Sequence, residues 1–289
     1  MNVVIGVDFV TERITFVHRL SVIGNRLSAL CIEVHLKAMK SKLYILTGAS
    51  RGMGLAMAEQ LARAGHSLIC ISRQSNAELA NLARHRNATL EQWQLDLANS
   101  VVVAARLRSW LGAANASHFQ SISLINNAGV IAKIGPFSET DSNDLENAMR
   151  VGLEAPMQLT AAFLHATADW KIPRKVLNIS SGLGRRAMAS QAAYCAAKAG
   201  MDHFTRCVAL DEALKDNGAK VCSLAPGVIA TDMQVQLRGA DPAQFPDIAN
   251  FIAMHDKGML DSPQTAAGKV LAYLEWEEFG SNAVADIRD

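Results

Sequence analysis

The sequence predicts an α/β fold in which a single parallel sheet of about seven strands is covered by helices on both faces. From residue 42 onward, short apolar segments alternate with longer amphipathic ones, and this alternation is typical of strands and helices that follow each other in turn. No internal repeat, low-complexity tract or linker interrupts the pattern. Because half of the 289 residues are apolar, the chain can form one large core, and we expect one domain.

The first half of the pattern contains four apolar, largely β-branched segments, which we interpret as buried parallel strands. The strands are expected at residues 42–48, 67–72, 88–97 and 119–129, and the helices between them at 53–65, 76–87 and 99–114. Gly65 is suited to end the first of these helices, since glycine readily adopts the left-handed conformation that follows a helix.

The second half continues the alternation to the end of the chain. Helices are expected at residues 141–168 and 191–216 on either side of a strand at 175–181, followed by a strand at 219–227, a helix at 263–276 and a short strand near 281–287. The segment 231–262 contains Pro242, Pro246 and Gly258 and is expected to be irregular. A long irregular segment inside a domain is often a lid or substrate loop, and we predict that role here.

The first 38 residues do not fit this pattern. They contain Asp8, Glu12 and Glu33 among arginines, which is typical neither of a signal peptide nor of a transit peptide. The domain is expected to begin at Met39, just before the first strand. We therefore interpret residues 1–38 as an N-terminal extension outside the core fold and residues 39–289 as the functional domain. The alternative is an extra strand or helix at the domain edge.

Composition excludes several classes of function. The net charge is +1, so no electrostatic attraction to nucleic acid or to an anionic membrane is expected. No apolar run approaches the roughly 20 residues of a membrane helix. The five cysteines are scattered without a C-x-x-C pair, which indicates reduced thiols and a cytoplasmic location. The histidines are equally dispersed, and no metal site is expected.

A glycine-rich stretch, "TGASRGMG" (47–54), lies where the first strand passes into the first helix. Gly48 permits a tight turn, while Gly52 and Gly54 let backbone amides and the helix N-terminus approach a pyrophosphate. A glycine cluster alone is weak evidence, but its position after the first strand favours a Rossmann-type, doubly wound sheet that binds a dinucleotide.

The end of the second strand indicates which dinucleotide is bound. An NAD site usually places an acidic residue there, whereas this chain has Ser72 and Arg73 and no carboxylate until Glu78. Arg51 lies inside the glycine loop as well. Two guanidinium groups suit a 2′-phosphate, so NADP(H) is the predicted cofactor. The alternative is two exposed arginines that bind no ligand.

Tyr194 and Lys198 are separated only by small residues in "YCAAK". Residues four apart on a helix share one face, so both side chains can reach one cleft. A tyrosine has a pKa of about 10, and a nearby ammonium together with oxidised nicotinamide would lower it. The pair is therefore a candidate for proton transfer, with Ser181, thirteen residues earlier, able to bind the substrate oxygen. An ordinary surface pair on an amphipathic helix is the alternative.

Taken together, six motifs resemble the short-chain dehydrogenase/reductase family over about residues 41 to 287. They are "TGASRGMG", Asp96 in "QLDL", "NNAG" (126–129), Ser181, "YCAAK" and "APGVIAT" (225–231). The resemblance implies that Ser181, Tyr194 and Lys198 are catalytic. It implies cofactor contacts for Gly48, Ser50, Arg51, Gly52, Met53, Gly54, Arg73, Asp96, Leu97, Asn127, Ala128, Gly129, Tyr194, Lys198, Pro226, Gly227, Val228 and Thr231.

Within that family the chain is most similar to the sepiapterin reductase and benzil reductase branch. The stretches "NISSGLGRRA", "APGVIATDMQ" and "GSNAVADIRD" carry this likeness. It implies an NADPH-dependent reductase of small ketones or vicinal diketones, with Ser181, Tyr194 and Asp286 contacting substrate, and a homodimer or homotetramer joined through the helices at 141–168 and 191–216. Asp286 in a solvated position is the alternative to an anchoring role.

Two further functions stay open: a 3-oxoacyl-thioester reductase of the same family, and a dinucleotide-binding sensor with little activity.

One departure from the family pattern, at Gly152, bears on the sensor alternative. Most relatives have an asparagine in the helix before the strand at 175–181, where it supports a water linked to the lysine, and this chain has Gly152 in "VGLEAP". We expect a working but impaired proton relay, and we expect Gly152→Asn to raise turnover.

Overall fold

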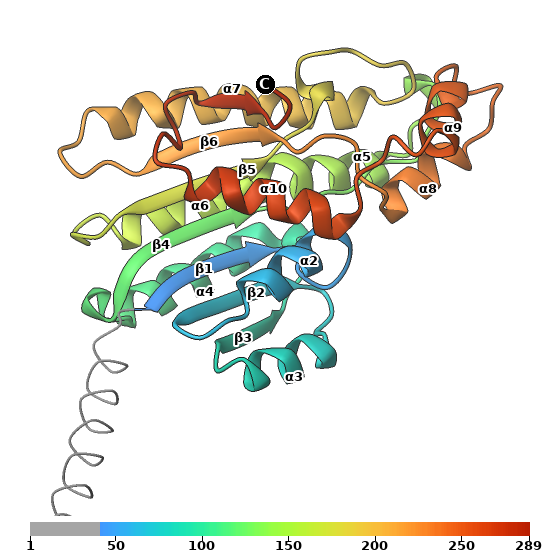
Figure 1. Ribbon diagram of the computed structural model, residues 1–289. Coiled ribbons are helices and arrows are strands. Elements are labelled where there is room, and N and C mark those ends of the chain that lie inside the picture. The colour runs from blue at the N-terminus through green and yellow to red at the C-terminus, as the bar shows by residue number, and fades with distance from the viewer. Residues whose placement is uncertain (1–40) are drawn as a thin grey trace, which may run out of the picture. The chain divides into compact units, whose positions relative to one another are not determined.

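The computed structural model describes residues 41–289, which form one seven-stranded sheet with helices on both faces (Figure 1). All strand pairs are parallel, and the strand order is β3-β2-β1-β4-β5-β6-β7. The predicted fold class is therefore confirmed. The extension predicted at residues 1–38 and the domain start predicted at Met39 lie outside the described residues.

The strands lie close to where the apolar segments predict them. They are β1 (Ser41–Thr47), β2 (His66–Ser72), β3 (Thr89–Gln94), β4 (Phe119–Asn126), β5 (Arg174–Ile179), β6 (Lys220–Ala225) and β7 (Val284–Asp286). In the register, Ile45 of β1 lies between Ile69 of β2 and Leu124 of β4. The strand order reverses between β1 and β4, and ligands bind at such switch points in open α/β sheets.

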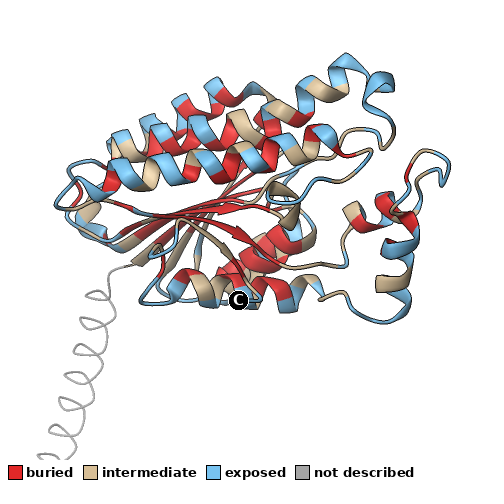
Figure 2. Cartoon of the chain, turned by 90° about the horizontal axis from the view of Figure 1, so that it is seen from above, coloured by how far each residue is buried: buried red, intermediate tan, exposed pale blue. Residues whose placement is uncertain are grey.

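Alternate residues of the strands face two separate apolar cores, as Figure 2 shows by the buried residues on either side of the sheet. Leu46 belongs to a core formed with α2 (Gly52–Leu61), α3 (Ala77–His85) and α10 (Pro263–Glu275). Ile45 belongs to a second core formed with α4 (Ser100–Ala113) and α6 (Ala155–Ala166). Because helices cover both faces, the strands are apolar on both sides, which explains why they appear as continuous apolar runs.

The helix predicted at 141–168 is interrupted. It consists of α5 (Ser142–Met149), a turn of π-helix (Arg150–Glu154) and α6. The helix predicted at 191–216 is observed as α7 (Ala192–Ala213), and the helix predicted at 53–65 ends at Leu61, four residues before Gly65. A π turn adds a residue to the helical repeat without a distinctive sequence signal, which is why the interruption was not predicted.

The prediction that residues 231–262 are irregular is wrong. This segment contains α8 (Asp232–Arg238) and α9 (Ile248–Asp256). Both prolines lie between the two helices rather than inside them, and helices of this length leave little periodicity to detect. The buried side chains of Leu237, Phe245 and Phe251 form a small apolar cluster that packs against Ile131 and Met188.

Within residues 41–289, no helix is both long enough and apolar enough to cross a membrane.

Candidate active site

The predicted site residues lie at the carboxyl ends of four neighbouring strands. The glycine loop follows β1, the "NNAG" stretch follows β4, Ser181 follows β5, and Pro226 follows β6. Because parallel strands end at the same edge of the sheet, segments far apart in the sequence meet there. The structure therefore brings most of the predicted cofactor and catalytic residues to one edge.

Two glycines of the glycine loop, Gly48 and Gly54, have no room for a side chain. Gly48 has a φ of 70°, and a Cβ added to Gly54 would lie 2.1 Å from the carbonyl oxygen of Gly48 and 2.5 Å from Nδ2 of Asn127. Asn127 donates from Nδ2 to the Thr47 carbonyl at 3.0 Å, and Thr47 Oγ1 accepts from the amides of Asn127 and Ala128. These hydrogen bonds hold the "NNAG" stretch against the end of β1, and Gly54 lets the first turn of α2 approach the loop, where a helix N-terminus can bind a pyrophosphate.

The two predicted 2′-phosphate ligands have different surroundings. Arg73 is exposed directly after β2. Arg51 is exposed too, and its guanidinium lies 2.9 Å from the carboxylate of Asp232 at the start of α8. Asp232 is therefore a charged partner that the sequence did not reveal. Arg51 would have to exchange this carboxylate for a phosphate.

The other predicted cofactor contacts occupy loops beside the glycine loop. Asp96 caps the following turn by accepting from the amide of Ala98 at 2.9 Å, and Leu97 is buried. A Cβ on Gly52 would lie 3.6 Å from Thr231 Cγ2, and Gly227 has a φ of 86°. Ser50 lies in the glycine loop and Met53 in the first turn of α2, whereas Pro226 and Val228 lie in the loop after β6. The residues thus fit a dinucleotide that lies across the ends of β1, β4 and β6.

Lys198 is almost completely buried in α7, with 4% of its surface exposed. Its ammonium donates to the carbonyl oxygen of Ile179, the last residue of β5, at 2.7 Å. The ammonium lies 5.7 Å from the centre of the Tyr194 ring, and a Cβ on Gly129 would lie 3.8 Å from it. The predicted pair does share one face of α7, on which Lys198 is buried against β5 and Tyr194 is half-buried.

Ser181 begins a tight 3₁₀ turn directly after β5. Its hydroxyl accepts from the amide of Leu183 at 3.2 Å, and it lies near enough to the Tyr194 phenol to lower the pKa of that group. The serine, the phenol and the buried ammonium are therefore brought together by β5 and the N-terminal half of α7. We call residues 181–185 the serine turn.

Burial controls the protonation of both titrating groups. It raises the pKa of Tyr194, with Ser181 acting in the opposite direction, and it lowers the pKa of Lys198 to about 8, with Asp202 acting in the opposite direction. The sequence predicts a lowered tyrosine pKa from the nearby ammonium together with oxidised nicotinamide. In the chain alone the pKa of Tyr194 is instead raised, because burial outweighs the effect of its neighbours. A tyrosine that keeps its proton near neutral pH suits a general acid.

A small cavity adjoins Tyr194. Its lining includes Ala132, Phe137, Ser190, Gln191 and Ala193. Ser190 has a φ of 63°, and its hydroxyl donates to the carbonyl of Gln244 in the loop between α8 and α9. The sequence analysis did not predict that Phe137 and Gln244 belong to the site. Phe137 could have been found, because it is an aromatic residue in the loop after "NNAG".

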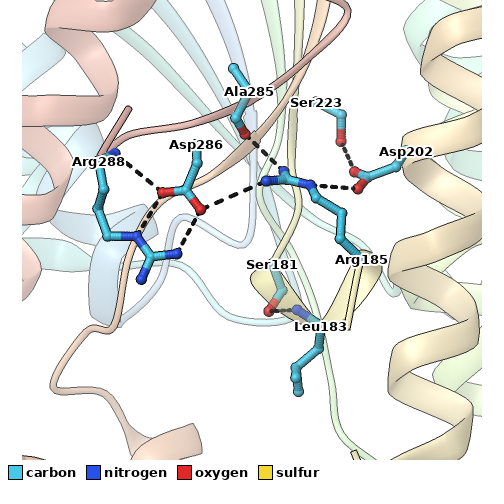
Figure 3. A network of polar contacts seen from close by, with 8 residues as sticks. All are labelled: Ser181, Leu183, Arg185, Asp202, Ser223, Ala285, Asp286 and Arg288. Atoms are coloured by element: carbon cyan, nitrogen blue, oxygen red, sulfur yellow. Dashed lines mark hydrogen bonds and ion pairs between the residues drawn. The ribbon is translucent and has the colours of Figure 1, made fainter. Parts of the chain in front are cut away.

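Asp286 ends β7, opposite Ala225 of β6. Its carboxylate accepts from the guanidinium of Arg288 at 2.7 and 2.8 Å and lies 3.7 Å from Arg185 (Figure 3). The Arg288 guanidinium holds the pKa of Asp286 below its ordinary value. The carboxylate predicted to anchor substrate is thus 8% exposed and paired with two arginines of its own chain.

Gly152 lies in the π turn, buried against α7. A Cβ on this residue would lie 3.1 Å from Cβ of Ala197, the neighbour of Lys198. An asparagine there would force α7 to move by a few tenths of an ångström. The room for a side chain at this position is therefore restricted.

In the part of the chain that the structure describes, no cluster of His, Cys, Asp or Glu side chains could hold a metal ion.

Comparison with known proteins shows the family. The model of the short chain dehydrogenase family matches residues 42–241, so the chain belongs to this family of nicotinamide-dependent oxidoreductases. It is 37% identical to the benzil reductase ((S)-benzoin forming) of Bacillus cereus over 84% of this chain and 98% of that protein. It is 31% identical to the sepiapterin reductase of Xenopus tropicalis over 87% and 98% of the two chains.

A solved structure supports the same fold. The 3-oxoacyl-[acyl-carrier protein] reductase from Brucella melitensis, in complex with NAD, aligns with a TM-score of 0.71 at 24% identity. The alignment covers 86% of this chain and 95% of that one. The predicted family and the predicted branch are confirmed.

The restricted space at Gly152 changes what Gly152→Asn should do. We expect the single variant to unfold a few degrees below the wild type, in line with the roughly 1–3 kcal/mol cost of overpacking. The higher turnover expected from an asparagine should then require Gly152→Asn combined with Ala197→Gly. Thermal unfolding and steady-state turnover of both proteins are the measurements.

Ala197→Gly alone is the matched control, because it creates the space without adding the amide. If Gly152→Asn alone unfolds like the wild type, the contact with Ala197 does not restrict this position.

Proposed function

We propose that this protein is an NADPH-dependent carbonyl reductase that acts on a small ketone or vicinal diketone. One observation carries the proposal. The buried ammonium of Lys198, the protonated phenol of Tyr194 and the hydroxyl of Ser181 lie together, beside a glycine loop that suits a pyrophosphate. A phenol held between a cation and a hydroxyl can give a proton to a developing alkoxide.

Each side chain has a distinct part in this proposal. When bound, NADPH supplies the hydride that the substrate carbon accepts. Ser181 donates a hydrogen bond to the carbonyl oxygen, and Tyr194 gives that oxygen its proton. Lys198 stabilises the phenolate that remains and binds the nicotinamide ribose. Because its pKa is about 8, Lys198 carries its charge at neutral pH despite its burial.

The preference for NADPH is supported by charge at the end of β2. Ser72 and Arg73 occupy the position where a ribose-binding carboxylate would favour NAD. Arg73 projects from the exposed surface there, and Arg51 lies in the glycine loop. A guanidinium binds phosphate by charge-assisted, often bidentate hydrogen bonds.

The cavity beside Tyr194 has a mixed lining. Its apolar part is formed by Ala132, Ala192, Ala193 and Phe137, and its polar part by Lys133, Thr140, Ser190 and Gln191. Phe137 is 58% exposed. An exposed phenyl ring at the edge of a cavity offers a face on which an aryl group can stack. The names of the benzil reductase and sepiapterin reductase relatives also indicate carbonyl groups next to rings, so we favour an aryl diketone such as benzil.

Two other functions give different outcomes in the same assay. Turnover of a 3-oxoacyl thioester without turnover of diketones would favour the thioester reductase. Binding of NADPH without turnover of any carbonyl would favour the sensor. A homodimer or homotetramer also stays a prediction, and it is supported by the exposed apolar side chains of Met157 on α6, Leu210 on α7 and Leu214 directly after α7.

The central test compares the wild type with Tyr194→Phe. We expect the wild type to oxidise NADPH in the presence of benzil, and the variant to lose about 10²- to 10⁴-fold in kcat because the proton donor is gone. The ring remains in Tyr194→Phe, so NADPH binding followed by fluorescence should be retained. Full turnover by Tyr194→Phe would show that another group donates the proton.

The cofactor preference is tested with Arg73→Gln. Loss of a charge-assisted hydrogen bond should raise the Kd of NADPH about tenfold or more and leave the Kd of NADH nearly unchanged. Both constants are measured by fluorescence titration. Arg63→Gln is the control, because Arg63 is exposed at the opposite edge of the sheet, before β2. Equal changes for the two cofactors would contradict a 2′-phosphate contact.

The substrate preference is tested with Phe137→Ala. We expect kcat/KM for benzil to fall about five- to tenfold, since an aromatic pair contributes about 1 kcal/mol or more. The value for 2,3-butanedione, which has no ring, should change little. Phe137→Leu keeps an apolar side chain without the ring and should give an intermediate result. Equal losses for both diketones would mean that Phe137 does not contact the aryl group.

A further inference from the structure

Arg185 connects three segments that lie far apart in the sequence. Its Nε donates to the carboxylate of Asp202 in α7 at 3.3 Å, and its Nη2 donates to the carbonyl of Ala285 in β7 at 2.8 Å. Its Nη1 lies 3.7 Å from the carboxylate of Asp286. Figure 3 shows the guanidinium lying between the two carboxylates. We call these four residues the Arg185 clamp.

The two carboxylates of the clamp are themselves fixed. Asp202 is buried and accepts from the hydroxyl of Ser223 in β6 at 2.6 Å. Asp286 is held by the side chain and the amide of Arg288. Both carboxylates are thus held by other residues and cannot easily move together with Arg185. The clamp therefore restricts the position of the Arg185 side chain.

Arg185 also ends the serine turn. The amide of Gly184 donates to the carbonyl of Ser181 at 2.9 Å, and the amide of Arg185 donates to that of Gly182 at 3.1 Å. A Cβ on Gly184 would lie 2.8 Å from the carboxylate of Asp202 and 3.0 Å from the carbonyl of Lys198. The turn that begins with Ser181 is therefore pressed against α7 at the level of Lys198.

We propose that Arg185 is a positioning residue, which holds the serine turn so that Ser181 stays beside Tyr194 and Lys198, and that Asp286 acts in catalysis through Arg185. The inference rests on the proposed reductase function and gives Asp286 a different part from the substrate anchor that the sequence predicts. Strand β5 fixes the start of the serine turn, and the clamp fixes its end.

The shape of arginine suits this arrangement. All three guanidinium nitrogens are used, each toward a different group: the carboxylate of Asp202 in α7, and the Ala285 carbonyl and the Asp286 carboxylate in β7. Lysine would keep the charge but carries a single ammonium, so it cannot reach the three partners in the same way. Charge and shape can therefore be separated by two substitutions, Arg185→Lys and Arg185→Gln.

The clamp also affects the charge around Lys198. Asp202 lies one helical turn after Lys198. The groups that face Asp202 are Arg185 from the serine turn and Ser223 and Cys222 from β6. Asp286 and Arg288 lie behind Arg185. Asp202 raises the pKa of Lys198 against the effect of burial. Without Arg185, the Asp202 carboxylate is less neutralised, and the pKa of Lys198 should rise above about 8.

The experiment compares Arg185→Gln, Arg185→Lys and Asp286→Asn with the wild type. We expect Arg185→Gln to lose about tenfold or more in kcat for benzil, because a small misplacement of a catalytic group has effects of that size. The KM for benzil and the Kd of NADPH should change by less than about twofold. Arg185→Lys should recover part of the loss, and Asp286→Asn should lower kcat without raising KM.

Two readouts separate positioning from a general loss of stability. Amide hydrogen exchange should become faster at residues 182–186 and 284–289 in Arg185→Gln. Reductive activity requires cationic Lys198 and falls as the pH rises through its pKa, so this alkaline decline should move to higher pH in Arg185→Gln. Arg186→Gln is the control, because Arg186 is an exposed neighbour and its loss should leave activity, exchange and pH profile unchanged.

Wild-type kcat and wild-type exchange in Arg185→Gln would overturn the proposal. If Arg185→Gln does not fold, Arg185→Lys decides by the same measurements. An increase in the KM for benzil with unchanged kcat in Asp286→Asn would restore the substrate anchor and overturn the part assigned to Asp286. If the wild type reduces no diketone, the proposed function fails, and hydrogen exchange of the serine turn still decides whether Arg185 holds it.

Discussion

The site depends on one hydrogen bond, from the buried ammonium of Lys198 to the carbonyl oxygen of Ile179. A buried cation is costly unless it is hydrogen-bonded, and this contact satisfies it at the end of β5. The same strand leads, two residues later, into Ser181. The distance between α7 and this strand therefore decides how far the phenol of Tyr194 lies from the serine hydroxyl.

A buried polar network supports the same spacing underneath the site. Asn126 at the end of β4 donates to Asn178 of β5 at 2.8 Å, and Asn178 donates to Thr205 of α7 at 2.9 Å. Buried amides are costly when unpaired, so each contact favours one position of α7 across the sheet. The catalytic helix is thus held by β4 and β5 together, in addition to Lys198.

Three glycines show how closely the segments around the site approach each other. A side chain on Gly54 would collide with the glycine loop, and one on Gly184 would collide with α7. At Gly152 the approach is less severe, and the neighbour is Cβ of Ala197. The first two glycines therefore allow backbone segments to meet, whereas the third lets the π turn approach the helix that carries Lys198.

The sequence by itself determined the parallel sheet, the site at its carboxyl edge and the shared face of Tyr194 and Lys198. These features follow from local patterns: the apolar period, the glycines after the first strand and a spacing of four on a helix. Only the tertiary structure decided that α8 and α9 form, that Arg51 faces Asp232, and that Asp286 pairs with Arg185 and Arg288. The two short helices have too few residues to show a period, and the Arg51–Asp232 and Arg185–Asp286 pairs join residues far apart in the chain. Such contacts depend on how the loops fold over the sheet edge, which no local pattern specifies.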